Sequence, residues 1–292
     1  METTLLSRPA LVVRRATHLG MCFGVRDAIA LAHATARQQP VTVLGELVHN
    51  ATVLASLETS GVRLARRQAE VTTEAVIITA HGTSDRNRAR LRDDGFTVVD
   101  STCPLVHFAH RALREMVAAG FHPVIIGQRE HVEVRGLTGD LDDYDVVLSE
   151  QDIGHIGPRP RLGIVSQTTQ PLERVRRLVG LIRARFPNAE VRFRDTVCQP
   201  TKQRQSAATE LAQESDVVIV VGGANSNNTK ELVATCACHC PRVHHVQHAG
   251  QLQAEWFREG DRVGLTAGTS TPDQEIDAVE QAIQQLGGCP TA

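Results

Sequence analysis

Hydrophobic and polar positions follow two alternating patterns along this chain. Short runs of consecutive apolar residues, such as those that end at Gly45, Gly127 and Gly222, are typical of strands buried inside a parallel sheet. The segments before these runs carry apolar residues at three- and four-residue spacings, which predicts amphipathic helices. Strands that alternate with helices in this way indicate parallel α/β layers.

The pattern occurs three times. Each occurrence opens with a cysteine where a strand passes into a helix: GMCFGVRDAIALAHA around Cys22, STCPLVHFAHRALREMV around Cys103 and TVCQPTKQRQSAATELA around Cys198. The glycine that ends the next apolar run follows its cysteine by 23 or 24 residues in every case. A polar loop, a further helix and a second apolar run come next, and that run ends in small polar residues: AHGTS, SQTT and TAGTS.

The repeat predicts an α/β fold of three quasi-equivalent α/β modules with parallel sheets. We expect module 1 at residues 17–103, module 2 at 104–197 and module 3 at 198–286, with a strand at 10–16 joining module 3. Ligands bind beyond the carboxyl ends of the strands in parallel sheets. If the modules face one another about a pseudo-threefold axis, the three repeated cysteines meet in one cavity.

Composition narrows the class of protein. The chain has 292 residues, of which 41% are hydrophobic and 22% charged, as in ordinary soluble globular proteins. A net charge of −2 and an aromatic content of 3% argue against a nucleic-acid partner or an anionic membrane surface. No secretory signal or membrane-spanning run is evident, which predicts a cytoplasmic protein. Its seven cysteines are then expected to be reduced thiols or metal ligands rather than disulfides.

The three repeated cysteines favour a metal centre. A lone cysteine at a helix start is most often a small buried residue, but three at equivalent points of a repeat indicate converging thiolates. A structural zinc site would usually show paired CxxC spacing, so widely separated ligands favour an iron–sulfur cluster over zinc. The segment CACHC, with Cys236, Cys238 and Cys240 on one face if extended, could form a small metal site, although buried thiols are the more common explanation. Cys289 is expected to be exposed and incidental.

Nine motifs occur in order between residues 20 and 273: GMCFGV, GELVHN, AHGTS, DSTCP, HVEVRG, SQTT, TVCQPT, GGANSNN and TAGTSTPD. The ordered set resembles the 4-hydroxy-3-methylbut-2-enyl diphosphate reductases, the LytB family, over nearly the whole chain. The resemblance implies one central [4Fe-4S] cluster per chain, held by Cys22, Cys103 and Cys198. It also implies reductive dehydroxylation of that diphosphate to isopentenyl and dimethylallyl diphosphate, the last step of the non-mevalonate isoprenoid pathway.

The same resemblance implies roles for polar residues in the motifs. The diphosphate would be bound by His49, His81, His131, Thr168, Ser226, Asn227, Asn228 and Ser270. Because these motifs contain no Arg or Lys apart from Arg135, protonated histidine is expected to supply the positive charge. Glu133 would be the proton source for the leaving hydroxide, with Thr168 as relay. A histidine or a loop glutamate is more often simply solvated or packed, and only position within the motifs outweighs that explanation.

Several alternatives stay open at this level. A related cluster reductase could act on another substrate, a non-catalytic protein could sense iron or oxygen through its cluster, and a zinc hydrolase is a weaker possibility. Departures from the commonest family pattern at Leu19, Phe23, Val132 and Arg135 affect loop shape rather than proposed ligands. No G-x-G-x-x-G fingerprint is present, so electrons are expected from a partner such as ferredoxin or flavodoxin with its reductase.

Overall fold

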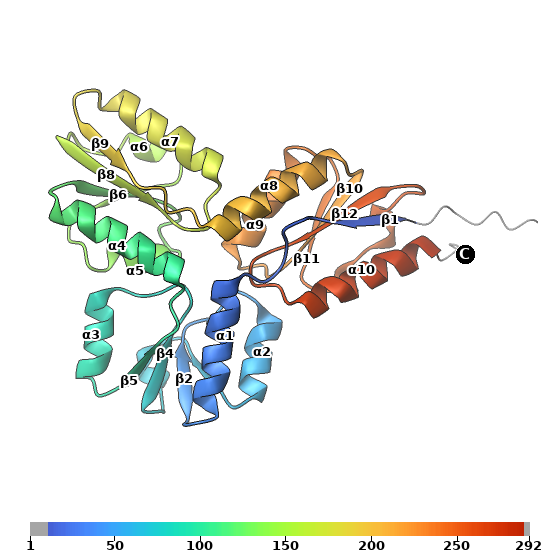
Figure 1. Ribbon diagram of the computed structural model, residues 1–292, viewed down its shortest axis with the longest axis horizontal. Coiled ribbons are helices and arrows are strands. Elements are labelled where there is room, and N and C mark those ends of the chain that lie inside the picture. The colour runs from blue at the N-terminus through green and yellow to red at the C-terminus, as the bar shows by residue number, and fades with distance from the viewer. Residues whose placement is uncertain (1–10, 289–292) are drawn as a thin grey trace, which may run out of the picture. The chain divides into compact units, whose positions relative to one another are not determined.

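The computed structural model describes residues 11–288, so Cys289 lies outside the described residues. This part of the chain forms three four-stranded sheets whose strands are all parallel, with helices packed against them (Figure 1). The predicted fold class, three parallel α/β modules, is confirmed. Two compact units contain the sheets: residues 11–22 with 202–288, and residues 23–201. The exact module boundaries stay a prediction.

The first sheet of the unit 23–201 has the strand order β3-β2-β4-β5. Its strands are β2 (Val41–Leu44), β3 (Arg63–Ala65), β4 (Ala75–Ile78) and β5 (Thr97–Asp100). Its helices are α1 (Phe23–Ala36), α2 (Ala51–Thr59) and α3 (Asp85–Asp93), with a short 3-10 helix, η1 (Gln68–Glu70). Every residue of β4 is buried, as expected for a continuous apolar run at the centre of a parallel sheet.

The second sheet of this unit repeats the arrangement with the order β7-β6-β8-β9. Its strands are β6 (His122–Ile126), β7 (Asp145–Val147), β8 (Arg161–Ser166) and β9 (Glu190–Phe193). Its helices are α4 (Pro104–Ala118), α5 (Val132–Thr138), α6 (Glu150–Ile153) and α7 (Leu172–Arg185). Proline in the first turn of α4 favours helix initiation immediately after Cys103, because that position needs no backbone donor.

The other unit holds the third sheet, β1-β12-β10-β11. Its strands are β1 (Val12–Arg15), β10 (Val217–Val221), β11 (Val243–Val246) and β12 (Arg262–Ala267). Helices α9 (Asn227–Ala237) and α10 (Asp273–Gly288) belong to it, α8 (Gln199–Gln213) leads into it, and η2 (Ala249–Gln251) and η3 (Ala254–Trp256) are 3-10 helices. Strand β1 pairs in parallel with β12, so residues from opposite ends of the chain complete one sheet.

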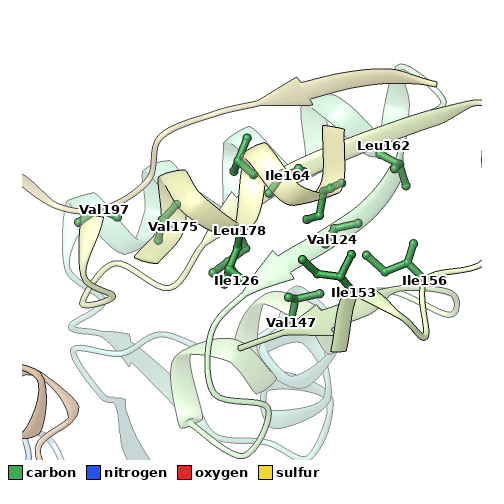
Figure 2. Packing of buried hydrophobic residues seen from close by; sticks show 12 residues of the cluster. Val124, Ile126, Val147, Ile153, Ile156, Leu162, Ile164, Val175, Leu178 and Val197 are labelled. Carbon is green, nitrogen blue, oxygen red and sulfur yellow. The ribbon is translucent and has the colours of Figure 1, made fainter. Parts of the chain in front are cut away.

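Apolar side chains hold each sheet to its helices, as the second sheet illustrates. Figure 2 shows its largest cluster, in which α7 contributes Val175 and Leu178 against Ile126 of β6 and Ile164 of β8. Leu178 and Ile164 have no accessible surface. Full burial of such a side chain stabilises a fold by about 1.5–3 kcal/mol relative to exposure. This packing keeps the loops at the strand ends on a rigid base.

No helix within residues 11–288 is long and apolar enough to cross a membrane.

Candidate functional site

The glycines that end the first apolar runs occupy the same place in all three sheets. The backbone N–H of each donates to the last residue of the adjacent strand: Gly45 to Ala65, Gly127 to Val147 and Gly222 to Val246, at 2.7, 2.9 and 2.9 Å. Gly45 has a φ of +101°, a conformation that favours glycine. The repeat seen in the sequence is therefore also a repeat of hydrogen bonds.

The three repeated cysteines are equivalent in the same sense. Each cysteine donates its backbone N–H to a backbone carbonyl: Cys22 to that of Thr269 at 3.0 Å, Cys103 to that of Ala80 at 3.1 Å and Cys198 to that of Thr168 at 2.9 Å. Each acceptor lies two residues beyond the end of the neighbouring strand, which is β12, β4 or β8. None of the three cysteines forms a disulfide within the described residues, and their side chains are partly exposed. The backbone thus presents each thiol beyond the carboxyl end of a parallel sheet, where ligands bind.

Two of the cysteine loops share the same hydrogen bond between an aspartate side chain and the backbone. Asp100 accepts a hydrogen bond from the backbone N–H of Thr102 at 3.0 Å, and Asp195 accepts one from Val197 at 3.1 Å. In both loops the aspartate stands three residues before the cysteine and forms an Asx turn. This signal was present in the sequence, as DSTC and DTVC, but was not recognised there as a structural element.

The loop of Cys22 is fixed differently. Leu19 stands where the other loops have aspartate, and it packs against the apolar core of its sheet. Gly20 follows with a φ of +72°, and its carbonyl accepts two hydrogen bonds from the buried Arg204 guanidinium, from Nε at 3.0 Å and Nη2 at 2.6 Å. A charged donor therefore replaces the Asx turn.

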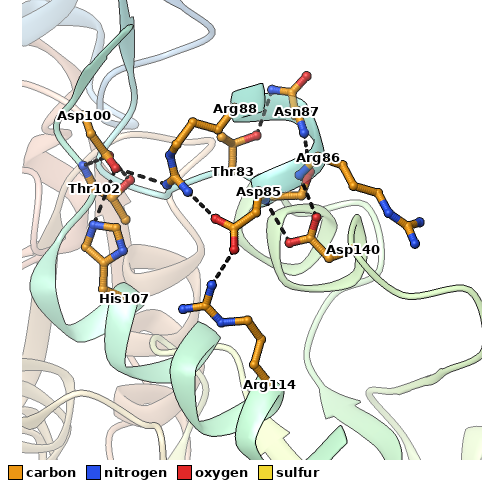
Figure 3. Close-up of polar contacts among 11 residues, drawn as sticks. Thr83, Asp85, Arg86, Asn87, Arg88, Asp100, Thr102, His107, Arg114 and Asp140 are labelled. Carbon is orange, nitrogen blue, oxygen red and sulfur yellow. Dashed lines mark hydrogen bonds and ion pairs between the residues drawn. The ribbon is translucent and has the colours of Figure 1, made fainter. Parts of the chain in front are cut away.

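A network of charged side chains supports the loop of Cys103 (Figure 3). Asp100, which shapes that loop, also accepts from Arg88 of α3 at 3.0 Å. Arg88 pairs with Asp85, which in turn pairs with Arg114 of α4. Asp140 caps the start of α3 by accepting from two of its backbone N–H groups, each at 2.8 Å. These contacts connect the helices of two adjacent sheets within the unit 23–201.

Gly24 leaves the space that the Cys103 thiol occupies. A Cβ built on Gly24 would clash with Cys103 Sγ and come within 3.1 Å of its Cβ. Gly24→Ala is therefore expected to displace the thiol and to reduce iron bound per chain several-fold, although all cysteines remain. Iron analysis after anaerobic reconstitution checks this, with Gly180→Ala as control because a Cβ there meets no atom within 4 Å. Wild-type iron content in Gly24→Ala would contradict the expectation.

The segment CACHC is not extended, and the preferred explanation of buried thiols holds for Cys236 and Cys240. Cys236 is in the last turn of α9 and Cys238 is its C-cap, so the residues follow a helix and a turn instead. Cys236 and Cys240 are buried, Cys238 is exposed, and the three thiols face different backbone carbonyls. Burial raises the pKa of Cys236 to about 12, which makes it a protonated, inert thiol at neutral pH. Within the described residues, no three His, Cys, Asp or Glu side chains are placed to hold a single metal ion.

His49, His81 and His131 form a compact cluster in the unit 23–201. The ring centroids of His49 and His81 are 4.3 Å apart in a stacked arrangement. The His131 ring meets both edge-on, at 5.5 and 5.6 Å. Only His49 and His131 occupy equivalent positions, four residues after Gly45 and Gly127; His81 lies in the loop after β4. Three separate loops therefore bring their imidazoles together.

Without substrate, the surroundings of His81 disfavour its charged form. The pKa of His81 is lowered well below its usual value of 6.5. Burial among protein atoms is the main cause, and the nearby His49 and His131 rings add to it. A neutral imidazole still donates one hydrogen bond. The His131 Nδ1 atom accepts from the backbone N–H of Glu133 at 3.1 Å, which leaves the proton of the neutral ring on Nε2.

Glu133 is buried rather than solvated. It lies in the first turn of α5, is 1% exposed, and accepts from both the backbone N–H and the hydroxyl of Thr168, at 2.7 and 3.0 Å. Burial raises the pKa of Glu133 to about 7, and the two hydrogen bonds from Thr168 only partly oppose this shift. A carboxyl group with this pKa can hold a proton and release it near neutral pH.

The remaining predicted ligands belong to the loops of the third sheet. Ser226 caps α9 and accepts from the Thr229 N–H at 3.3 Å, while Asn228 accepts from the Thr269 N–H at 3.0 Å. The Asn228 Nδ2 atom is buried with no hydrogen-bond partner in the described part of the protein, as suits a group that binds an external acceptor. Asn227, the first residue of α9, and Ser270, in the loop after β12, are also buried.

The predicted site residues therefore fall into two sets. The unit 23–201 brings together the three histidines, Glu133 and Thr168. The Thr168 carbonyl also accepts from the backbone N–H of Cys198. Cys103 and Cys198 belong to the same unit. Cys22 and the third-sheet residues Ser226, Asn227, Asn228 and Ser270 lie in the other unit.

Known proteins resemble this chain along nearly its full length. The family model described as "LytB protein" matches residues 13–284. The 4-hydroxy-3-methylbut-2-enyl diphosphate reductase of Aquifex aeolicus is 37% identical over 277 residues, which cover 93% of this chain and 95% of that protein. The enzyme of the same name from Geobacter metallireducens is 35% identical over 280 residues, with coverage of 95% and 98%. The chain belongs to the LytB family.

Solved structures agree with this membership. A structure of (E)-4-hydroxy-3-methyl-but-2-enyl diphosphate reductase, described as the terminal enzyme of the non-mevalonate pathway, has a TM-score of 0.68 and 37% identity, covering 94% of this chain and 99% of that one. The E-1-hydroxy-2-methyl-but-2-enyl-4-diphosphate reductase from Plasmodium falciparum has a TM-score of 0.88 and 25% identity, with coverage of 94% and 88%.

Membership in the LytB family implies an iron–sulfur cluster, and the cysteines of this chain fit that group. Thiolates are the usual protein ligands of such clusters. Three partly exposed cysteines, none of them in a disulfide within the described residues, share one backbone arrangement, and Gly24 leaves room for one of their thiols. Two of the departures from the family pattern have an ordinary place in this LytB protein, since Leu19 packs against the apolar core of its sheet and Val132 is the first residue of α5.

Proposed function

We propose that this chain is a 4-hydroxy-3-methylbut-2-enyl diphosphate reductase. The reaction removes the substrate hydroxyl as water with two electrons and two protons, and it gives isopentenyl and dimethylallyl diphosphate. The observation that carries the proposal is the buried Glu133, hydrogen-bonded to Thr168 beside three clustered histidines. A proton source next to several phosphate donors is what this chemistry requires of a protein.

The proposed cofactor is one [4Fe-4S] cluster per chain, with Cys22, Cys103 and Cys198 as ligands. When bound, such a cluster supplies electrons and a Lewis-acidic iron. The protein contributes the three thiolates, held by the equivalent backbone hydrogen bonds of their loops. Fixed ligands keep a site in its reactive geometry without a cost of reorganisation during turnover.

The diphosphate is proposed to bind His49, His81 and His131 together with Thr168, Ser226, Asn227, Asn228 and Ser270. The Nδ2 group of Asn228, which is buried without a hydrogen-bond partner among residues 11–288, is a suitable donor to a phosphate oxygen. A bound dianionic group favours the charged form of nearby imidazoles. We therefore expect His81, whose pKa burial lowers in the structure without substrate, to take up a proton when the diphosphate binds, which supplies positive charge to the site.

Glu133 is proposed to provide the proton for the leaving hydroxide through Thr168. The protonated carboxyl can donate from Oε2 to Thr168 Oγ1, 3.0 Å away, and the threonine hydroxyl then donates its own proton onward. Hydroxide is a poor leaving group until it is protonated. Because a cluster that only senses iron or oxygen needs no such acid, this arrangement favours the reductase over the sensor.

Electrons are proposed to come from a small one-electron carrier such as ferredoxin or flavodoxin with its reductase. The sequence carries no G-x-G-x-x-G fingerprint for a nicotinamide or flavin nucleotide.

The turnover number is expected to fall as pH rises through about 7. Glu133 is protonated below its pKa of about 7 and ionised above it, so the acid that the reaction uses is lost in this direction. Stopped-flow turnover of reduced enzyme from about pH 6 to 9, with saturating substrate, measures this profile. A pH-independent turnover number across this range would contradict the assignment of Glu133.

A comparison of two substrates tests the proposed function. Anaerobic protein with its cluster should convert the hydroxylated diphosphate, and the corresponding monophosphate should be a much poorer substrate through a raised KM. Equal use of both compounds, or conversion of neither, would argue for the related reductase or the sensor, respectively.

A further inference from the structure

The side chain of Thr201 lies against a proposed cluster ligand. Its Oγ1 atom is 3.0 Å from the Sγ atom of Cys198, and the threonine is fully buried. Thr201 is in the first turn of α8, three residues after the cysteine, so both side chains lie on the same side of the helix start. Thr201 closes the motif TVCQPT, but neither the proposed diphosphate ligands nor the proton relay uses its hydroxyl.

This contact differs from what other helical threonines of the chain do. A threonine hydroxyl in a helix commonly donates to the carbonyl four residues earlier. Four threonines here follow that rule, namely Thr35, Thr59, Thr138 and Thr235, which donate to Leu31, Ala55, Val134 and Glu231. Thr201 faces a sulfur atom instead. A threonine in the first turn of a helix is free to do so, because the carbonyl four residues before it lies outside the helix.

The direction of the hydrogen bond follows from the chemistry of the ligand. Cysteine coordinates metal as a thiolate, which has no proton to donate and can only accept. The Thr201 hydroxyl must then be the donor. The Cys198 backbone is anchored by its bond to Thr168 and by the Asx turn of Asp195, so the sulfur cannot easily turn away.

We infer that Thr201 tunes the reduction potential of the cluster by donating a hydrogen bond to the thiolate of Cys198. This inference rests on the proposed function. Reduction adds negative charge to the cluster and its thiolates, and a buried donor stabilises the more negative state. Hydrogen bonds to cluster sulfurs are among the features that set the potentials of such centres. Thr201 is thus a positioning residue that acts through Cys198 and need not touch the substrate.

Thr201→Val tests the inference, because valine has nearly the same shape and no hydroxyl. The midpoint potential, measured by potentiometric titration of the anaerobic holoprotein with EPR detection, is expected to become more negative. A loss of about tenfold in the equilibrium constant for one-electron reduction corresponds to about 59 mV. Thr201→Ser keeps the hydroxyl donor, so its midpoint potential should differ from that of the wild type by only a small fraction of that shift. Thr35→Val, which removes a buried helical hydroxyl in α1, is the matched control and should leave the potential unchanged.

Each other outcome has a distinct meaning. An unchanged potential in Thr201→Val, or an equal shift in Thr201→Ser, overturns the tuning role while the proposed function stands. Loss of iron from Thr201→Val assigns the residue a structural role instead and also overturns the inference. Wild-type protein that binds no cluster under these conditions would overturn the proposed function and this inference together.

Discussion

Replacing Cys22, Cys103 or Cys198 by serine is expected to remove the brown chromophore and to reduce turnover to the background of the assay. Each of these residues is proposed to be one of only three protein ligands of the cluster, and an alcohol is a far weaker ligand for iron than a thiolate. Their equivalent backbone bonds, to Thr269, Ala80 and Thr168, give no reason for one of them to be dispensable. Absorbance, iron and sulfide of anaerobically reconstituted protein measure the result.

Cys238→Ser is the control for this series. Cys238 is exposed at the end of α9, so its loss should leave cluster content and stability close to those of the wild type. Loss of the cluster from Cys238→Ser, with retention in Cys103→Ser, would show that the ligands have been assigned to the wrong cysteines.

Glu133→Gln is expected to lower the turnover number by about 10²–10⁴-fold, the usual contribution of general acid catalysis. Glutamine keeps the size of the side chain and can still accept from Thr168, but it has no titratable proton. KM should change little, because the histidines and the third-sheet donors are untouched. The pH dependence of the turnover number near 7 should disappear together with the carboxyl group whose pKa burial raises to about 7.

Two further variants sharpen this test. Glu130→Gln alters an exposed glutamate of the same loop and should behave as the wild type. Thr168→Val should show a smaller defect of the same kind, because it removes the relay but leaves the acid. Near-normal turnover in Glu133→Gln with a full cluster would mean that the proton comes from another donor, such as His131 or the substrate diphosphate.

Much of the fold could be predicted from the sequence because its signals are local. The spacing from Cys22, Cys103 and Cys198 to their following glycines reflects one helix and one strand, and the structure repeats both in each sheet. The apolar runs at β4 and β10 are buried along their whole length, as their composition indicates. Parallel strands then bring the polar loops to one edge of each sheet.

Features that depend on distant contacts could not be predicted in this way. The burial of Glu133 depends on Thr168, which is 35 residues away, and the pKa of His81 depends on loops from two other strands. The charged contacts of Asp85 with Arg88 and Arg114 involve charged side chains with many possible partners in the sequence. The alternating cysteines of CACHC are compatible with an extended segment or a helix end, and the structure shows that α9 continues through Cys236.

The central claim is that this chain removes the hydroxyl group of its substrate at an iron–sulfur cluster. One anaerobic sample answers it most directly: reconstituted protein is analysed for iron and sulfide, reduced chemically, and given 4-hydroxy-3-methylbut-2-enyl diphosphate. The account predicts about four irons and four sulfides per chain, as in a [4Fe-4S] centre, and formation of isopentenyl and dimethylallyl diphosphate in proportion to cluster content. A full cluster with no product, or product formed equally well by protein without a cluster, would contradict it.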